Sequence, residues 1–356
     1  MTRFLQLHYL TAYPPANLNR DDTGRPKTAE FGGTTRLRIS SQALKRAWRT
    51  SDLFKRQLAG KLGERTQRIG AVIRDHLLDR ELDESETLRI ARAVADVFGK
   101  PVSESDRNPT YIEQLAFISP EERAAAVALA DRMAKGDEPE TKAAVRDVLR
   151  TADTAVDIAM FGRMLADNPA YNREAAVQVA HAITTHRTVV EDDYYTAVDD
   201  LKRPSEDAGA GFIGETGFGA GVFYLYICID QDLLVGNLGG DAELAATGIS
   251  ALIEAAATVA PRGKQASFAS RAKAGFILAE RGESAPRSLA AAFLKPVKPW
   301  LHDDRNDDDV MTLSIQRLMN MRDRFAAAYG EELDYQAVDV AAGRASLAEL
   351  IMFARA

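Results

Sequence analysis

Basic side chains surround a predicted strand–corner–helix segment at residues 31–50, FGGTTRLRISSQALKRAWRT. Arg36 and Arg38 alternate with apolar residues, which is the period-2 pattern of a half-buried strand. Ser40 and Ser41 follow, and a serine hydroxyl is a good N-cap for the helix that comes next. We therefore expect the two arginines to reach the start of that helix.

The helix predicted from Ser41 to about Leu58 is amphipathic. Lys45, Arg46 and Arg49 fall on one helical face, and leucine, alanine and tryptophan side chains fall on the other. Free N–H groups at a helix start, combined with nearby cations, suit a row of phosphates. The alternative is a solvated helix with ordinary surface charge.

The bulk composition indicates an ordinary globular protein. The chain has 356 residues, of which 46% are hydrophobic and 27% charged, enough for about two domains. No apolar run approaches a membrane span, and the N-terminal sequence lacks the pattern of a signal peptide. Cys228 is the only cysteine, so an internal disulfide is impossible and we expect a cytoplasmic location.

The charge is unevenly distributed. Residues 20–74 carry 14 Lys/Arg against 5 Asp/Glu, whereas the whole chain has a net charge of −7. The rest of the chain is therefore strongly acidic. A basic region on an acidic body favours directional binding over general attraction to polyanions.

Hydrophobic periodicity divides the chain into strands and helices. Strands are predicted at 3–10, 36–39, 176–188, 222–230 and 274–280, and helices at 41–58, 243–259, 284–293, 310–329 and 345–355. A long loop is expected at 11–29, a helical insertion at 59–150, and a glycine-rich block at 189–221. Within the insertion, residues 62–79 have helical periodicity, and Ser119 with Glu122 forms a capping box that predicts the start of a further helix. Without the insertions the order is βαββαβ, the split unit of α+β ferredoxin-like folds, which RNA-recognition modules share.

The glycine-rich block contains a G-x-G-x-x-G match at residues 209–214. More glycines follow where a dinucleotide site would need a helix, so we reject that interpretation. A flexible loop carrying Phe212, Ile213 and Phe218 is the better prediction. These side chains either wedge between bases or pack on a neighbouring domain.

Few residues suggest a metal or a catalytic centre. The five histidines lack metal-ligand spacing, so we predict structural histidines, no bound metal and no cofactor. Asp21 and Asp22 lie in the basic loop and could hold a metal for phosphodiester cleavage, or could simply hydrogen-bond within the loop to the adjacent Arg20. A second basic loop at 261–273 includes Lys264 and is either a further anion contact or ordinary surface.

Several stretches together resemble the CasC family, the backbone subunit of the type I-E CRISPR Cascade complex in the RAMP superfamily. They are LNRDD at 18–22, FGG at 31–33, RLRISSQALKRAWR at 36–49, KLGER at 61–65, GRM at 162–164, AHAITTH at 180–186, TAVDDL at 196–201, GVFY at 221–224 and KQASFA at 264–269. The resemblance implies a palm like an RNA-recognition motif, with helical fingers and a thumb hairpin. The matching domain boundaries are 1–58, 179–188 and 222–356 for the palm, 59–178 for the fingers and 189–221 for the thumb.

The family's function implies a non-catalytic subunit that assembles as a helical filament along a CRISPR RNA (crRNA) in antiviral defense. Its implied partners are that RNA, the target DNA strand paired with it, further copies of the chain, other Cascade subunits and a recruited helicase-nuclease, with no membrane. The RNA-binding positions implied by the resemblance and by the second basic loop are Arg20, Lys27, Arg38, Ser40, Gln42, Lys45, Arg46, Arg49 and Lys264. The base-wedging positions would be Met164, Thr196, Phe212 and Ile213.

Two rival functions remain open. One is a metal-dependent ribonuclease of a related CRISPR effector, in which Asp21 or Asp22 would act. The other is a generic single-strand binder that does not assemble on its ligand.

Overall fold

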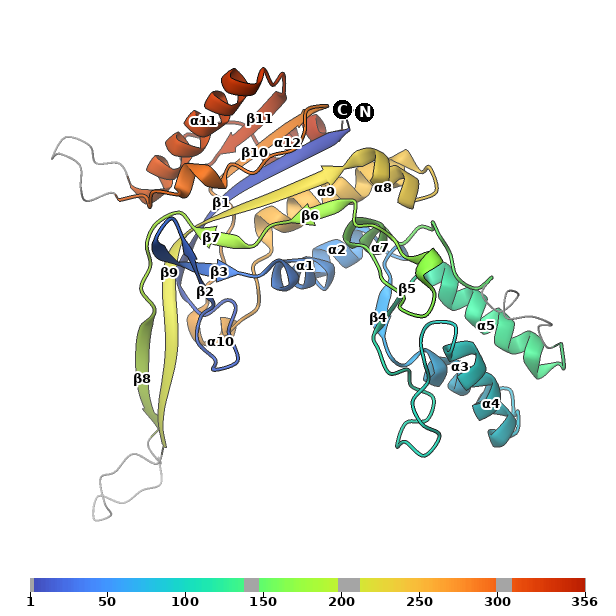
Figure 1. The fold of residues 1–356 in the computed structure, drawn as a ribbon. Helices are drawn as coiled ribbons and strands as arrows, with labels where there is room; N and C mark the ends of the chain where they lie inside the picture. Colours follow the sequence, from blue (N-terminus) through green and yellow to red (C-terminus); the bar gives the residue numbers. More distant parts are fainter. Residues whose placement is uncertain (1–2, 138–146, 198–211, 299–308, 356) are drawn as a thin grey trace, which may run out of the picture. The chain divides into compact units, whose positions relative to one another are not determined.

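The structure is a computed structural model that describes residues 3–137, 147–197, 212–298 and 309–355, without the side chains of residues 212 and 213. The chain forms two compact units. The first contains residues 1–51, 179–228 and 252–356, and the second contains residues 52–178 and 229–251. Both are mixtures of helices and strands (Figure 1).

Within the described residues, one nine-stranded sheet runs in the order β11-β10-β1-β9-β7-β3-β2, with β6 and β8 also paired to β9. Its strands are β1 (Phe4–Ala16), β2 (Thr28–Phe31), β3 (Thr34–Ile39), β6 (Val177–Val179), β7 (Ala182–Thr184), β8 (Glu191–Ala197), β9 (Phe212–Asp230), β10 (Phe276–Gly282) and β11 (Asp334–Asp339). Antiparallel pairs include Leu7 opposite Ala279 and Arg38 opposite Ile183.

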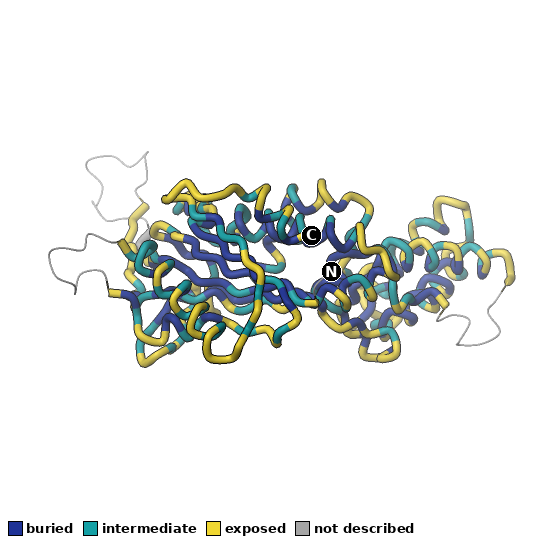
Figure 2. The backbone as a smooth tube through the Cα atoms, turned by 90° about the horizontal axis from the view of Figure 1, so that it is seen from above, coloured by how far each residue is buried: buried dark blue, intermediate teal, exposed yellow. Residues whose placement is uncertain are grey.

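Strand β1 is buried on both faces, which explains its nearly continuous apolar sequence. Tyr9 donates a long hydrogen bond of 3.5 Å to the Ile253 carbonyl of helix α9 (Ala242–Thr258). Leu10, on the opposite face, joins a core cluster with Leu318 of helix α11 (Val310–Tyr329). Figure 2 shows the strands of this sheet as mainly buried backbone. Helices therefore cover both faces, as the buried residues at successive positions require.

Several predicted element boundaries were wrong. The predicted loop at 11–29 is shorter, because β1 continues to Ala16 and β2 begins at Thr28. The predicted strand at 176–188 is only the two short strands β6 and β7. Only a short 3-10 helix, η2 (Ala290–Phe293), occurs in the predicted helix 284–293, and β11 was not predicted at all.

The predicted helix 41–58 is two helices, α1 (Ser41–Arg49) and α2 (Asp52–Gln57). Thr50 and Ser51 separate them, with hydroxyls that donate to the carbonyls of Arg46 (2.8 Å) and Trp48 (2.7 Å). Such local hydrogen bonds compete with helix continuation. The division between the two units also falls here, after Ser51.

The glycine-rich sequence after residue 211 forms a strand, which corrects the predicted flexible loop. Gly217, Gly219 and Gly221 alternate along β9, so they lie on one face of the strand. A Cβ at these positions would come within 3.0 Å of Pro26, Leu37 and His186, respectively. The glycines therefore admit close neighbours. Residues 198–211, which include the start of the G-x-G-x-x-G match, lie outside the described part of the chain.

The second unit is largely helical around a small two-stranded sheet of β4 (Glu64–Thr66) and β5 (Ala116–Ile118). Besides α2, its described residues form the helices α3 (Ile69–Leu78), α4 (Glu84–Ala95), α5 (Pro120–Ala134), α7 (Val156–Phe161), the 3-10 helix η1 (Pro169–Tyr171) and α8 (Gln231–Asn237). Ser119 and Glu122 form a capping box at the start of α5, with proline at the first turn. That helix start was predicted, whereas β4 was taken for part of a helix.

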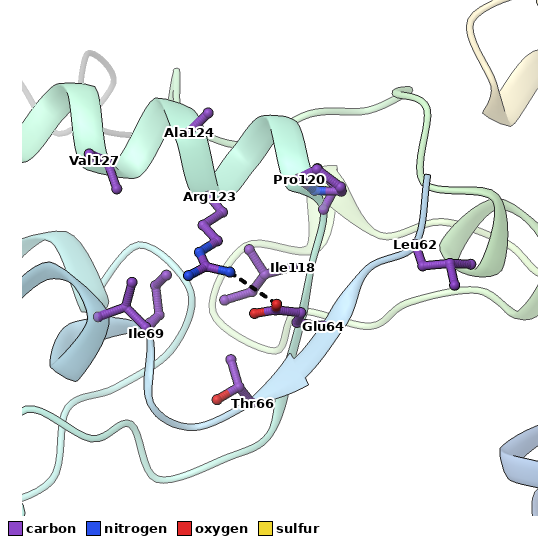
Figure 3. A pocket seen from close by; sticks show the side chains of 11 residues that line it. Leu62, Glu64, Thr66, Ile69, Ile118, Pro120, Arg123, Ala124 and Val127 are labelled. Atoms are coloured by element: carbon purple, nitrogen blue, oxygen red, sulfur yellow. Dashed lines mark hydrogen bonds and ion pairs between the residues drawn. The ribbon is translucent and has the colours of Figure 1, made fainter. Parts of the chain in front are cut away.

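A mostly apolar hollow of about 440 Å³ lies in the second unit between α5 and β4 (Figure 3). Ile69, Ile118 and Val127 contribute apolar side chains to its lining. Arg123 reaches across and pairs with Glu64 at 3.0 Å. No described helix is long and apolar enough to cross a membrane.

Candidate RNA-binding site

The predicted basic site is built on the corner between β3 and α1. Ser40 is the N-cap of α1, and its hydroxyl accepts from the Ala43 N–H at 3.4 Å. Leu44, Ala47 and Trp48 bury the apolar face of α1, while Gln42 and Arg46 are exposed and Lys45 and Arg49 are half-buried. The predicted amphipathic division of this helix is therefore confirmed.

Three cations of the site lie close enough to one histidine to lower its pKa. Arg38 donates from Nη1 to Nδ1 of His181 at 2.8 Å. Desolvation lowers the pKa of His181, and the positive charges of Arg38, Lys27 and Lys45 lower it further. The structure thus brings together a loop cation, a strand cation and a helix cation, as the sequence predicted. We refer to Lys27, Arg38, Lys45, Arg46 and Arg49 as the basic corner.

The loop before β2 is held against this corner. Asn19 accepts the Ser40 N–H at 2.8 Å, and its own carbonyl accepts the Lys27 N–H at 2.9 Å. The Lys27 carbonyl accepts the Arg38 N–H at 2.8 Å. Arg20 is exposed in the same loop and forms a backbone bridge with Pro26. These bonds fix the backbones that carry Arg20, Lys27 and Arg38.

Two predicted members of the site differ from expectation. Arg36 was placed beside Arg38 in the basic patch, but its side chain is fully buried. Its guanidinium donates to the carbonyls of Thr184 (2.9 Å) and Phe293 (2.8 Å), so it joins distant segments. Ser40 is also buried, which was not expected of an RNA-binding residue, but its hydroxyl is the N-cap of α1 that the sequence predicted.

The second basic loop approaches the first. Lys264 precedes the short helix α10 (Gln265–Phe268) and has a left-handed backbone. At Gly263 an added Cβ would lie 2.3 Å from the Leu18 carbonyl, so the two loops touch. Lys264 is thereby placed on the loop that contacts the segment leading into Asn19.

The predicted base-wedging residues fall in both units. Thr196 lies exposed on β8, opposite Ile213 of β9, and Phe212 pairs with Ala197 at the end of the described strands. Met164 belongs to the second unit and is 78% exposed. Phe218, assigned to the same loop as Phe212, is half-buried instead, with its ring 5.9 Å from that of Phe268.

The Asp21 carboxylate, a candidate for metal-dependent catalysis, is hydrogen-bonded within its own loop. One carboxylate oxygen accepts the Thr23 N–H (3.0 Å), the Thr23 hydroxyl (2.8 Å) and the Arg25 N–H (2.9 Å). These bonds, led by the hydroxyl, lower the pKa of Asp21. Asp21 therefore holds a tight turn, with Thr23 and Arg25 as partners in place of the expected Arg20. Among the described side chains no group of three potential metal ligands occurs.

Some residues of the site were not predicted. His181 was assigned a structural role, yet it is exposed beside Arg38. Tyr194 and Tyr195 are exposed on β8, and the Tyr195 ring covers Gly214 so closely that a Cβ there would overlap it. Tyr195 lies opposite Gly214 in the hairpin, and that glycine was a sequence signal for Tyr195, whereas Tyr194 lies opposite Glu215 and had no such signal.

The sequence model of CT1975-like proteins matches residues 5–351, nearly the whole chain. The chain belongs to the CT1975-like protein family. No curated protein matches the sequence.

Two solved structures are similar to this member of the CT1975-like family over 99% of both chains. One, with 29% identity and a TM-score of 0.85, is a chain of a "CRISPR RNA-guided surveillance complex, pre-nicking". Another, with 25% identity and a TM-score of 0.74, is a chain of a "CRISPR RNA-guided surveillance complex". These similarities cover both the sheet with the basic corner and the helical unit.

Proposed function

We propose that the chain is a non-catalytic, crRNA-binding backbone subunit of a Cascade surveillance complex of type I-E. The basic corner carries this proposal, because Lys27, Arg38 and Lys45 converge at the capped start of α1. Clustered cations and a helix N-terminus suit consecutive phosphates and require no particular base sequence. Membership of the CT1975-like family and similarity to surveillance-complex chains support the same function.

We further propose a ferredoxin-like palm in the first unit, made of β1, β7, β9 and β10. The sheet order β10-β1-β9-β7 supports it, since this is the order 4-1-3-2 of a βαββαβ unit. The second unit would provide the fingers, and β8 with the first half of β9 would form the thumb. In Figure 1 these two strands run side by side.

In this proposal, copies of the chain assemble along the guide RNA. The basic corner of each copy holds the phosphates, and the thumb displaces a base at regular intervals with Thr196, Phe212 and Ile213. Met164 of the second unit is the fourth proposed base-wedging residue. The remaining bases stay open to pair with target DNA in antiviral defence. Other Cascade subunits and a helicase-nuclease would complete the complex.

A shortened thumb tests this proposal most directly. Asp193 and Thr216 are directly paired, so a two-residue Asn-Gly turn in place of residues 194–215 closes the hairpin between them. The unmodified chain should assemble on crRNA as a multimer set by RNA length and protect it periodically. The shortened chain should bind RNA without regular protection. The same stoichiometry and footprint in both proteins would contradict the thumb assignment.

The ribonuclease remains the second candidate because Asp22 is exposed in the loop beside the basic corner. Incubation of bound RNA with Mg²⁺ or Mn²⁺ distinguishes the two functions. Intact RNA supports the scaffold, and cleavage lost on Asp22→Ala would support the enzyme.

A further inference from the structure

Residues that precede β2 contact the base of the thumb at one pair of residues. Asp192 of β8 and Gly217 of β9 are direct partners in the hairpin. Asn17, which is fully buried, donates from Nδ2 to the Gly217 carbonyl at 2.9 Å and to the Gly24 carbonyl at 3.0 Å. One side chain therefore joins the thumb to the loop that precedes β2.

A second contact holds the other strand of the same pair. Arg25 places Nη2 2.9 Å from the Asp192 carboxylate and Nη1 3.8 Å from that of Glu215. The adjacent Pro26 ring lies against Gly217, where an added Cβ would be 3.0 Å from its Cδ. Both strands of the thumb base thus contact residues 25 and 26.

The other end of this loop belongs to the basic corner. The Lys27 N–H and carbonyl bond to Asn19 and Arg38, and Asn19 also accepts the Ser40 N–H. Lys27 therefore follows directly after the two residues that contact the thumb. A change in backbone direction at residues 25–27 would move both the corner and the hairpin base.

We propose that Arg25 and Asn17 are positioning residues that orient the thumb relative to the phosphates held at the basic corner. This inference rests on the proposed function. The Arg25 pairs are half-exposed, and such pairs are individually weak. Their effect comes from acting on the same pair of residues as the buried Asn17 amide and the Pro26 ring. Arg25 thus binds thumb carboxylates, whereas Lys27 faces the corner.

Charge reversal with a matched control tests the inference in the free protein. Arg25→Glu should speed hydrogen exchange of the backbone amides at 191–197 and 214–217 by about two- to fivefold, the size expected from an exposed ion pair. Arg187→Glu is the control, because Arg187 lines the same groove beside Arg25 and makes the same charge change. The double variant Arg25→Glu/Asp192→Arg should restore slow exchange. Equal exchange in Arg25→Glu and the control would overturn the inference.

The crRNA footprint gives the functional readout. Because the hairpin is looser, Arg25→Glu should lower the contrast between protected and unprotected positions of the crRNA by at least about twofold. The charge-swapped double variant should regain that contrast. Arg187→Glu should keep the periodicity even where its affinity falls. Sharp periodicity in Arg25→Glu would overturn the inference. Absence of RNA binding by the unmodified protein would instead refute the proposed function, and the exchange comparison would still decide the loop–thumb contact.

Discussion

Arginine clusters occur in both units, but their surroundings differ. In the second unit, buried guanidiniums meet buried carboxylates: Arg163 pairs with Glu122 at 2.5 Å, and Arg173 pairs with Asp153 at 2.7 Å. At the basic corner of the first unit, Arg38 meets the His181 ring, and burial together with the charges of Arg38 and the neighbouring cations lowers the pKa of His181. Buried charges need partners to remain in the protein, whereas clustered cations at a surface attract an anionic ligand.

Removing a buried acid should therefore produce the largest loss of stability. Glu122→Ala should destabilise the protein by about 3–5 kcal/mol, because the Arg163 charge stays buried without its carboxylate. The Glu122 carboxylate also accepts the Arg150 N–H at 2.9 Å and closes the capping box of α5. Denaturant unfolding measures the change.

The control for this prediction is the exposed acid Glu64, which pairs with Arg123 at the hollow in Figure 3. Glu64→Ala should cost no more than about 1 kcal/mol, as for other exposed pairs. Equal destabilisation by Glu122→Ala and Glu64→Ala would remove the distinction between buried and exposed pairs in this unit.

Arg36 and Arg38 repeat the comparison within one strand. Arg36→Ala should destabilise the protein by about 2–4 kcal/mol, because the Thr184 and Phe293 carbonyls lose a charged donor. Arg38→Ala should leave stability within about 1 kcal/mol and weaken RNA binding. Unfolding and binding measurements on both variants test this. A stable Arg36→Ala protein with weakened RNA binding would mean that Arg36 binds RNA and does not have the structural role assigned to it.

The same pair shows where sequence reasoning fails. Period-2 alternation correctly places Arg36 and Arg38 on one face of β3, but it cannot reveal what covers that face. The carbonyls that bury Arg36 belong to residues 148 and 257 positions away. Burial by distant segments is a tertiary property that a local pattern does not contain.

Sequence-based predictions were correct for features that depend only on neighbouring residues. The Ser119–Glu122 capping box and the bounds of α11 were predicted correctly, because capping and helical periodicity depend on neighbours in sequence. Glycines 217, 219 and 221 misled us, since glycine is rare in strands. Their alternate spacing was the overlooked signal, although the neighbours that require it come from elsewhere in the chain.

Charge reversal at the basic corner should act on binding alone. Lys45→Glu/Arg49→Glu should weaken RNA binding for all sequences and flatten the slope of log K against log salt by roughly 1.4. The matched control is Lys55→Glu/Arg56→Glu on α2, which makes the same charge change outside the corner. Equal slopes for the corner variant and the unmodified protein would remove Lys45 and Arg49 from the RNA site.

His181 should report RNA at the corner with a smaller effect. Desolvation and then the charges of Arg38, Lys27 and Lys45 lower the pKa of His181 in the free protein, and bound phosphates would screen those charges and raise the pKa. Binding should then take up protons, so affinity should rise as pH falls through the pKa of the complex. NMR titration of the ring with and without RNA measures the shift. The pH dependence should weaken in His181→Gln, and a pKa unchanged by RNA would place the phosphates elsewhere.

The smallest expected effect is that of substituting Asp21 or Asp22 on RNA cleavage. The Asp21 carboxylate is engaged by three donors of its own turn, so Asp21→Ala should loosen the loop and modestly weaken RNA binding. Asp22→Ala is the matched control for loss of one acidic charge in the same loop. RNA should remain intact with Mg²⁺ or Mn²⁺ in all three proteins, as judged by gel analysis. Metal-dependent cleavage by the unmodified protein that either substitution abolishes would show that this loop is an active site, and the basic corner would then hold a substrate.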